Sequence, residues 1–161
     1  MSDEPLELRA VESLAGEVEL VLAELRGELS TIAPDVCVEH IGATSMPDGI
    51  TKGDVDVNLR VAAERFDSLV ASLSARFDVA QPQNWSGTYA SFSDARRGLP
   101  LGIQVTVTGS DDDFLVDLRD RMLENPDLRC RYDAVKRANA SAGRDAYWHA
   151  KDDFLRRLRD R

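Results

Sequence analysis

The sequence has few cysteines, a deficit of basic residues and no long hydrophobic run. Its two cysteines, Cys37 and Cys130, lie outside any CxxC spacing, which favours a reducing compartment over a disulfide framework. There are 20 Lys and Arg against 29 Asp and Glu, so the formal net charge is -9 and extended binding of nucleic acid is not expected. No apolar run approaches the ~20 residues that span a membrane. The acidic start, MSDEPLEL, is unlike a signal peptide.

These absences predict a cytoplasmic protein that does not bind membranes. The length of 161 residues suits a single domain, residues 1–161, with a hydrophobic core of its own. Hydrophobic residues make up 43% of the chain and charged residues 30%, which is the balance of an ordinary globular domain.

Hydrophobic periodicity predicts helices at both ends of the chain and in the middle. Apolar residues recur every three or four positions from Glu4 to about Leu29, over residues 62–77 and from Asp145 to Arg161. In the last of these, one stripe is formed by Tyr147, Lys151, Phe154, Leu155 and Leu158. Ser110 with Asp113 predicts a capping box at a helix start.

Strict alternation of polar and apolar residues predicts strands over residues 54–61 (DVDVNLRV) and 101–108 (LGIQVTVT). Residues 36–42 (VCVEHIG) are rich in β-branched side chains and predict another. ARRGLP, residues 95–100, is typical of a hairpin loop. Because helices and strands are mixed without regular alternation, we predict an α+β fold: a small mixed or antiparallel sheet covered by helices, with a helical C-terminal part.

The strand DVDVNLRV is the first candidate site. Asp54, Asp56, Asn58 and Arg60 share one face of it. Carboxylates two residues apart can converge on one cation, and Mg²⁺ is commonly held by one or two carboxylates together with substrate phosphates. We therefore treat Asp54 and Asp56 as candidate catalytic residues and Mg²⁺ ligands. The alternative is an acidic solvent face in an acidic protein.

The loop before this strand adds candidate phosphate ligands. Gly42 would let backbone N–H groups approach a ligand, Thr44 and Ser45 offer hydroxyls, and Lys52 offers a positive charge. Ser45 lies two residues before Pro47, a pattern that can begin a short helix and bind an anion. The alternative is an ordinary connecting loop. Arg60 and, from the strand 101–108, Gln104 complete the candidate nucleotide-binding set.

Histidine and aromatic residues leave their roles open. His40 could serve acid–base chemistry or form a structural hydrogen bond at a strand end, and the structural role is favoured. His149 is expected to be structural. Trp85 and Tyr89 could stack on a base or pack in the core.

The segment VEHIGATSMPDGITKGDVDV resembles the signature of the GrpB-like family, which reads roughly EHIGSTSVPGLxxKPIIDI. The stretch LRDRMLENPDLRCRYDAVK and the final YWHAKDDF also resemble the end of that family's domain. The resemblance covers residues 38 to 154 and implies a compact nucleotidyltransferase-like fold, in which a Gly-Ser turn and a DxD strand form a site for a nucleotide triphosphate and metal.

The departures from that pattern bear on activity. Ala43 replaces a serine, Asp54 is an additional acid beside Asp56, and residues 103–107 lack the family's histidines. The third acid of the nucleotidyltransferase superfamily also has no counterpart. The resemblance thus implies a domain that binds a nucleotide or another phosphorylated small molecule with a divalent metal, as a possible nucleotidyltransferase. The alternative is a catalytically degenerate ligand-binding or protein-interaction module; a toxin–antitoxin nucleotidyltransferase is a weaker third.

Overall fold

The computed structural model describes residues 5–161. Within this range five strands form the main sheet, in the spatial order β2-β4-β7-β6-β5. Their bounds are β2 (Val38–Ile41), β4 (Val55–Val61), β5 (Asp78–Val79), β6 (Tyr89–Asp94) and β7 (Leu101–Val107). The central pair β4 and β7 is parallel and the other pairs are antiparallel, so the sheet is mixed. A short separate pair joins β1 (Arg9–Ala10) to β3 (Ile50–Thr51).

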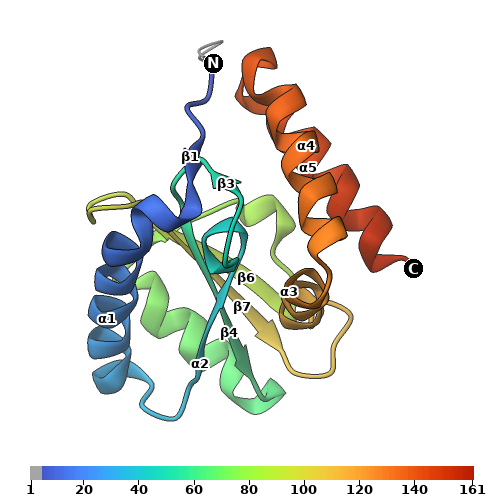
Figure 1. Ribbon diagram of the computed structural model, residues 1–161. Coiled ribbons are helices and arrows are strands. Elements are labelled where there is room, and N and C mark those ends of the chain that lie inside the picture. Colours follow the sequence, from blue (N-terminus) through green and yellow to red (C-terminus); the bar gives the residue numbers. More distant parts are fainter. Residues whose placement is uncertain (1–4) are drawn as a thin grey trace.

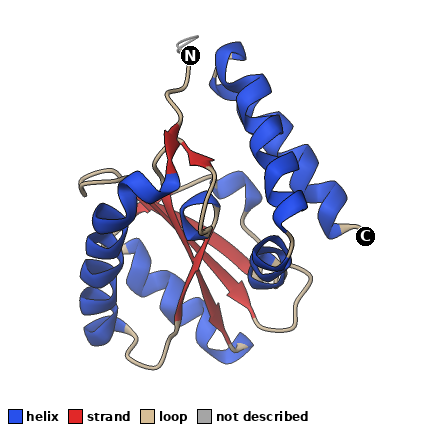
Figure 2. Cartoon of the chain, in the orientation of Figure 1, coloured by secondary structure: helices blue, strands red, loops and turns tan. Residues whose placement is uncertain are grey.

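Helices cover both faces of the main sheet (Figure 1). On one face lie α1 (Ala15–Ile32) and α2 (Ala63–Ser74), and on the other α3 (Leu115–Glu124), α4 (Pro126–Asn139) and α5 (Arg144–Arg159). Figure 2 shows the strands crossing between these two helical groups. Short 3-10 turns complete the path: η1 (Val11–Leu14), η2 (Ala43–Ser45), η3 (Pro82–Asn84) and η4 (Ala140–Ala142).

Alternation along β4 and β7 gives the sheet one apolar and one polar face. Val55, Val57 and Leu59 of β4 are fully buried and pack with the apolar side chains of α1 and α2 in one core cluster. The alternate residues, such as Asp56 and Gln104, point to the opposite face. Burial of each such Val or Leu contributes ~1.5–3 kcal/mol, so the apolar face fixes the orientation of the polar one.

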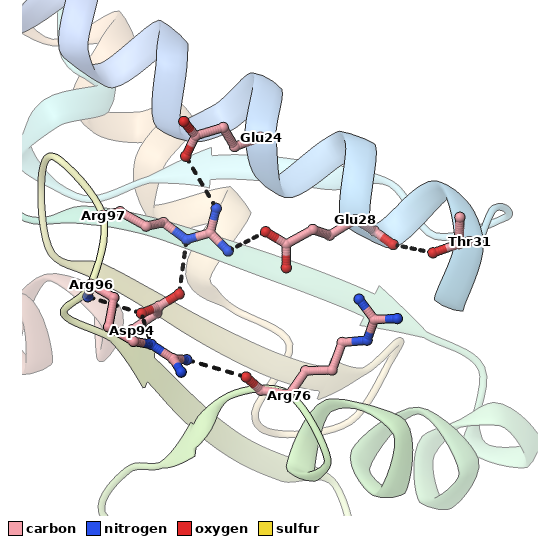
Figure 3. Close-up of polar contacts among 7 residues, drawn as sticks. All are labelled: Glu24, Glu28, Thr31, Arg76, Asp94, Arg96 and Arg97. Atoms are coloured by element: carbon pink, nitrogen blue, oxygen red, sulfur yellow. Dashed lines mark hydrogen bonds and ion pairs between the residues drawn. The ribbon is translucent and has the colours of Figure 1, made fainter.

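A buried arginine fastens the β6–β7 hairpin to α1. Arg97 is 8% exposed in its side chain, and its guanidinium pairs with Asp94 (3.0 Å), Glu24 (3.4 Å) and Glu28 (2.5 Å) (Figure 3). Burial alone would raise the pKa of Asp94, but hydrogen bonds from Arg96 and the charges of both arginines lower it below its usual value. Every charge in this network therefore has a partner.

A second, smaller apolar cluster joins α3, α4 and α5. It contains Met46, Leu118, Met122, Leu128, Tyr132 and Leu158. Lys136 of α4 is 2% exposed, donates to the carbonyl of Ile50 and pairs with Asp133 at 2.9 Å. The Asp133 carboxylate in turn lies against Gly49, where a Cβ would come within 2.7 Å of its oxygen. These contacts fix α4 on the loop that leads into β4.

The α+β class and the mixed sheet are confirmed, as are the strands at 38–41, 55–61 and 101–107 and the hairpin between β6 and β7. The first helix was predicted too long: α1 begins at Ala15, because residues 9–14 form β1 and η1 instead. The start of that prediction, Glu4, lies outside the described residues. The capping box is wrong, because α3 begins at Leu115 and Asp113 pairs with Arg60. None of the helices described for residues 5–161 is long and apolar enough to cross a membrane.

Candidate functional site

A cleft of about 450 Å³ lies between the polar face of the sheet and the helices α3 and α5. Its sheet side carries Asp54, Asp56, Gln104 and Tyr89, and its helical side carries residues of α3 and one whole face of α5. The lining therefore includes charged, hydrogen-bonding and aromatic groups. The polar face that the sequence predicted has a facing wall and does not point into bulk solvent.

Asp56 occupies a space that two glycines leave open. In the sheet register Asp56 lies beside Ile41 of β2 and Gly102 of β7. A Cβ at Gly102 would lie 2.5 Å from Oδ1 of Asp56, and one at Gly42 would lie 2.9 Å from Oδ2. Gly42 also has a φ of 76°, a conformation that other residues rarely adopt. Both glycines are thus needed for the carboxylate to sit at the floor of the cleft.

The Asp56 carboxylate is half-buried, and among residues 5–161 neither a hydrogen bond nor an ion pair reaches it. Burial, followed by the negative charge of Asp54, raises the pKa of Asp56 to about 6, against which the positive charges of Lys151 and Lys52 act only partly. A carboxylate in this state is stabilised by any cation or donor that enters the cleft. Shifts of this kind often occur at functional sites, so Asp56 is a candidate ligand-binding group.

Asp54 differs from Asp56 in already having a partner. Its Oδ2 lies 2.5 Å from Nζ of Lys52, and both side chains line the cleft. The backbone of Asp54 is held by Thr44, whose hydroxyl donates to the Asp54 carbonyl at 3.1 Å. The positive charge of Lys52 is therefore already compensated by Asp54 in the free protein.

Two groups of α5 that sequence reasoning did not assign to the site face the same space. Tyr147 is fully buried, and its hydroxyl has no partner among the described residues. Lys151 lies one turn further, with Nζ 5.3 Å from the centre of the Tyr147 ring, and no ion pair or hydrogen bond to residues 5–161 reaches it. Burial and the charge of Lys52 lower the pKa of Lys151 to about 8. Trp148, 46% exposed, lines the cleft beside them.

The structure brings together five of the predicted site residues and separates three. Gly42, Lys52, Asp54, Asp56 and Gln104 all line the cleft. Thr44 does not, because its hydroxyl is buried between Nε2 of His40 (2.9 Å) and the Asp54 carbonyl. Ser45 donates to the Gly42 carbonyl at 2.6 Å.

Arg60 is the third residue outside the cleft. It lies at the far end of β4, where its Nε and Nη2 donate to the two carboxylate oxygens of Asp113 at 2.6 and 2.7 Å. The pair holds the turn before α3 and raises the pKa of Arg60. Its charge is thus directed away from Asp54 and Asp56.

The remaining candidates divide between structure and site. His40 projects to the α1 side of the sheet; burial, then the charges of Arg26 and Arg119, lowers its pKa to about 4. Trp85 packs edge-on against Phe92 and donates to the Ala80 carbonyl. Tyr89 lines the cleft and donates to Oε1 of Gln104 at 3.2 Å.

Asp54 and Asp56 are suited to Mg²⁺ that is also coordinated by phosphate oxygens of a ligand. They do not form a site in which the protein alone supplies every ligand of the metal. Among the described residues there is no cluster of three or more acidic, His or Cys side chains that could hold a metal. Asp54 and Asp56 supply two carboxylates, the number that Mg²⁺ often takes from a protein when phosphate oxygens and waters fill its other positions. The unpartnered Asp56 carboxylate is the observation that favours a cation at this place.

The fold and the cleft define a small α+β protein in which one polar face of a mixed sheet is enclosed by a C-terminal group of helices. The same fold occurs in GrpB from Enterococcus faecalis, whose crystal structure aligns with a TM-score of 0.76 at 19% identity, over 96% of this chain and 95% of that one. The chain is also 28% identical to a UPF0157 protein of Vibrio cholerae over 131 residues, 81% of this chain and 70% of that protein. Residues 11–161 match the family described as GrpB protein, and the chain belongs to this family.

Proposed function

We propose that the cleft binds a nucleotide or another phosphorylated small molecule together with Mg²⁺, as a nucleotidyltransferase-like domain. The observation that supports this most is the Asp56 carboxylate, which lies half-buried beside Asp54 in the cleft without a partner among residues 5–161. A bound cation would stabilise the ionised form of both carboxylates.

Each residue of the cleft has a role in this proposal. Asp54 and Asp56 would hold Mg²⁺, which when bound offsets charge on phosphoryl oxygens. Lys52 would turn from Asp54 toward the ligand once a cation shares that carboxylate. Gln104, fixed by the Tyr89 hydroxyl at 3.2 Å, would orient a polar group of the ligand. The enclosing helices would exclude water and hold the ligand in place.

Binding without chemistry is the second candidate, favoured by the neighbour of Asp56 on β7. The cleft face of β7 carries Gly102, Gln104 and Thr106, and none of these can act as the third acid that nucleotidyl transfer in the superfamily uses. A degenerate module of the same fold would retain ligand binding and lack transfer. Sustained release of pyrophosphate from a nucleoside triphosphate, or formation of a modified acceptor, would show that the protein catalyses transfer and does not only bind.

The proposal is tested by calorimetric titration with ATP, GTP and CTP, each with and without Mg²⁺. Wild type is expected to bind at least one of them in a Mg²⁺-dependent manner, and Asp54→Asn/Asp56→Asn is expected to abolish that dependence. Asp67→Asn/Asp153→Asn is the matched control, because it removes the same charge from exposed positions outside the cleft. The absence of binding to wild type, or equal binding by both double variants, would reject the proposal.

A further inference from the structure

One face of α5 lines the cleft for the length of the helix. Its residues recur one helical turn apart: Tyr147, Trp148, Lys151, Asp152, Leu155, Arg156 and Arg159. The helix itself packs on α4, η4 and α3, with little direct contact to the main sheet. Leu158 lies in the small second cluster, and Phe154 and Leu155 pack against it. Tyr147 and Lys151, at the other end of the cleft face, are not part of that cluster.

Two donors on this face are buried without acceptors. The hydroxyl of Tyr147 is inaccessible and unpaired among the described residues, although buried hydroxyls usually find a partner. The ammonium group of Lys151 is half-buried, and no acidic side chain of residues 5–161 lies within ion-pair distance of it. The other cations that line the cleft have partners: Lys52 pairs with Asp54, Arg119 with Glu39 at 2.7 Å and Arg156 with Asp152 at 2.6 Å, and Arg159 donates to the Asp111 carbonyl at 3.2 Å.

We propose that Tyr147 and Lys151 form an anion-binding wall, which takes the phosphate of the ligand from the α5 side while Asp54 and Asp56 face it from the sheet. This inference rests on the proposed function, because it places the phosphate group of the same ligand. Lys151 lies over the Tyr147 ring and presents its ammonium group to the phosphate. When the Lys151 side chain moves toward the phosphate, the Tyr147 hydroxyl, inaccessible in the free protein, is opened and donates to the same phosphate.

The arrangement reverses the expectation from the sequence. The loop hydroxyls of Thr44 and Ser45 are committed to protein acceptors, so they are not presented to an anion. Arg60 is committed to Asp113. The unpaired donors instead come from α5, near the end of the chain. The cleft thus offers acceptors on its sheet side and donors on its helix side, which complements a metal-bound phosphate.

The neighbouring Trp148 supplies a spectroscopic report on this wall. It is one of two tryptophans in the chain, and the other, Trp85, is packed against Phe92. In a Trp85→Phe background, the emission of Trp148 is expected to change when inorganic pyrophosphate is added in the presence of EDTA. Calorimetry with the unmodified chain gives the affinity independently, so the experiment does not depend on the Trp85 substitution.

The expected result is a loss of pyrophosphate affinity of at least tenfold in Lys151→Met and of about threefold in Tyr147→Phe. Arg157→Met is the matched control: it removes a positive charge from the exposed side of the same helix and should bind as wild type does. Circular dichroism and a thermal melt verify that each variant is folded.

The outcomes separate this inference from the proposed function. If Mg²⁺–nucleotide binds through Asp54 and Asp56 but Lys151→Met and Tyr147→Phe bind pyrophosphate and nucleotide as wild type does, the anion-binding wall is rejected alone. If pyrophosphate binds through Lys151 and no nucleotide shows Mg²⁺ dependence, the proposed function is rejected and the wall stands. Equal weakening by Arg157→Met, or no binding of pyrophosphate to wild type, also rejects the wall.

Discussion

Buried charges are paired on one face of the main sheet and unpaired on the other. On the α1 side, Arg97 is almost inaccessible and contacts three carboxylates, those of Asp94, Glu24 and Glu28. On the cleft side, Lys151 and Asp56 are half-buried in the same space, and neither has a partner within ion-pair distance among residues 5–161. The charges on the first face are paired within the protein, whereas the two charges on the second face are not.

This difference separates a structural ion network from the unpaired charges of the candidate site. When one member of a buried ion pair is removed, the other is left as an uncompensated buried charge, and the protein is destabilised. A buried charge that has no partner already lowers the stability of the free protein, and a bound ligand of opposite charge would offset that cost. Substitutions on the two faces should therefore change folding stability in opposite directions.

The largest effect is expected from Arg97→Met. The substitution would remove the partner that Asp94 shares with two glutamates of α1. The cost should lie at the lower end of the ~3–5 kcal/mol of breaking a buried pair, because Asp94 keeps its bonds from Arg96. Urea denaturation followed by circular dichroism measures this. Arg96→Met is the control, because Arg96 contacts the same Asp94 but is 68% exposed, and its midpoint should move little. Similar losses in both variants would show that burial does not distinguish them.

Asp56→Asn is expected to stabilise the free protein near neutral pH. A pKa of about 6 in the folded protein against 3.8 ordinarily means that the ionised form is disfavoured by roughly 3 kcal/mol at most. Well below pH 3.8 both the folded and unfolded chains carry a neutral Asp56 and the substitution gains nothing. The gain should grow as pH rises from 4 to 6 and stay constant above that.

Denaturant unfolding of wild type and Asp56→Asn at pH 4, 5, 6 and 8 measures this dependence. Asp67→Asn, on the exposed side of α2, should show no such rise. If Asp56→Asn destabilises the protein at pH 8, the carboxylate has a stabilising partner and the contrast between the two faces fails.

Tyr147→Phe should have the smallest effect on folding. The hydroxyl that it removes is buried without a partner among the described residues, so its loss is expected to change the free energy of unfolding by less than about 1 kcal/mol, toward stabilisation. Tyr89→Phe is the comparison, because it removes a hydroxyl that donates to Gln104 and should destabilise slightly. A clear destabilisation by Tyr147→Phe would indicate a hidden acceptor. The thermal midpoints of both variants decide.

The sequence predicted the sheet side of the cleft better than its helical side. Alternation in DVDVNLRV was enough to place Asp54 and Asp56 away from the core, because side-chain direction in a strand follows from a period of two. The loop residues were harder to predict. The Thr44 hydroxyl is turned away from the cleft because it forms a hydrogen bond with Nε2 of His40. That hydrogen bond requires the turn at Gly42, which the spacing of the residues did not predict.

The wall on α5 could not be derived from spacing. Tyr147, Lys151, Phe154, Leu155 and Leu158 formed one stripe in the sequence, which is typical of a helix face in a core. In the structure the stripe is divided: Leu158 and Phe154 pack with α4, while Tyr147 and Lys151 face the cleft. Which part of a stripe meets a core depends on how α5 crosses α4. The one available signal was the resemblance of YWHAKDDF to the GrpB-like pattern.

The two glycines that flank Asp56 have a consequence for chemical rescue. Because Gly42 and Gly102 leave a space that only this carboxylate fills, Asp56→Gly would leave a vacancy bounded by three glycines, at the floor of an open cleft. Formate or acetate from solution has the size and charge to occupy that vacancy. A carboxylate that belongs to the protein could thus be replaced by one that is dissolved, and its contribution to binding could be titrated by concentration.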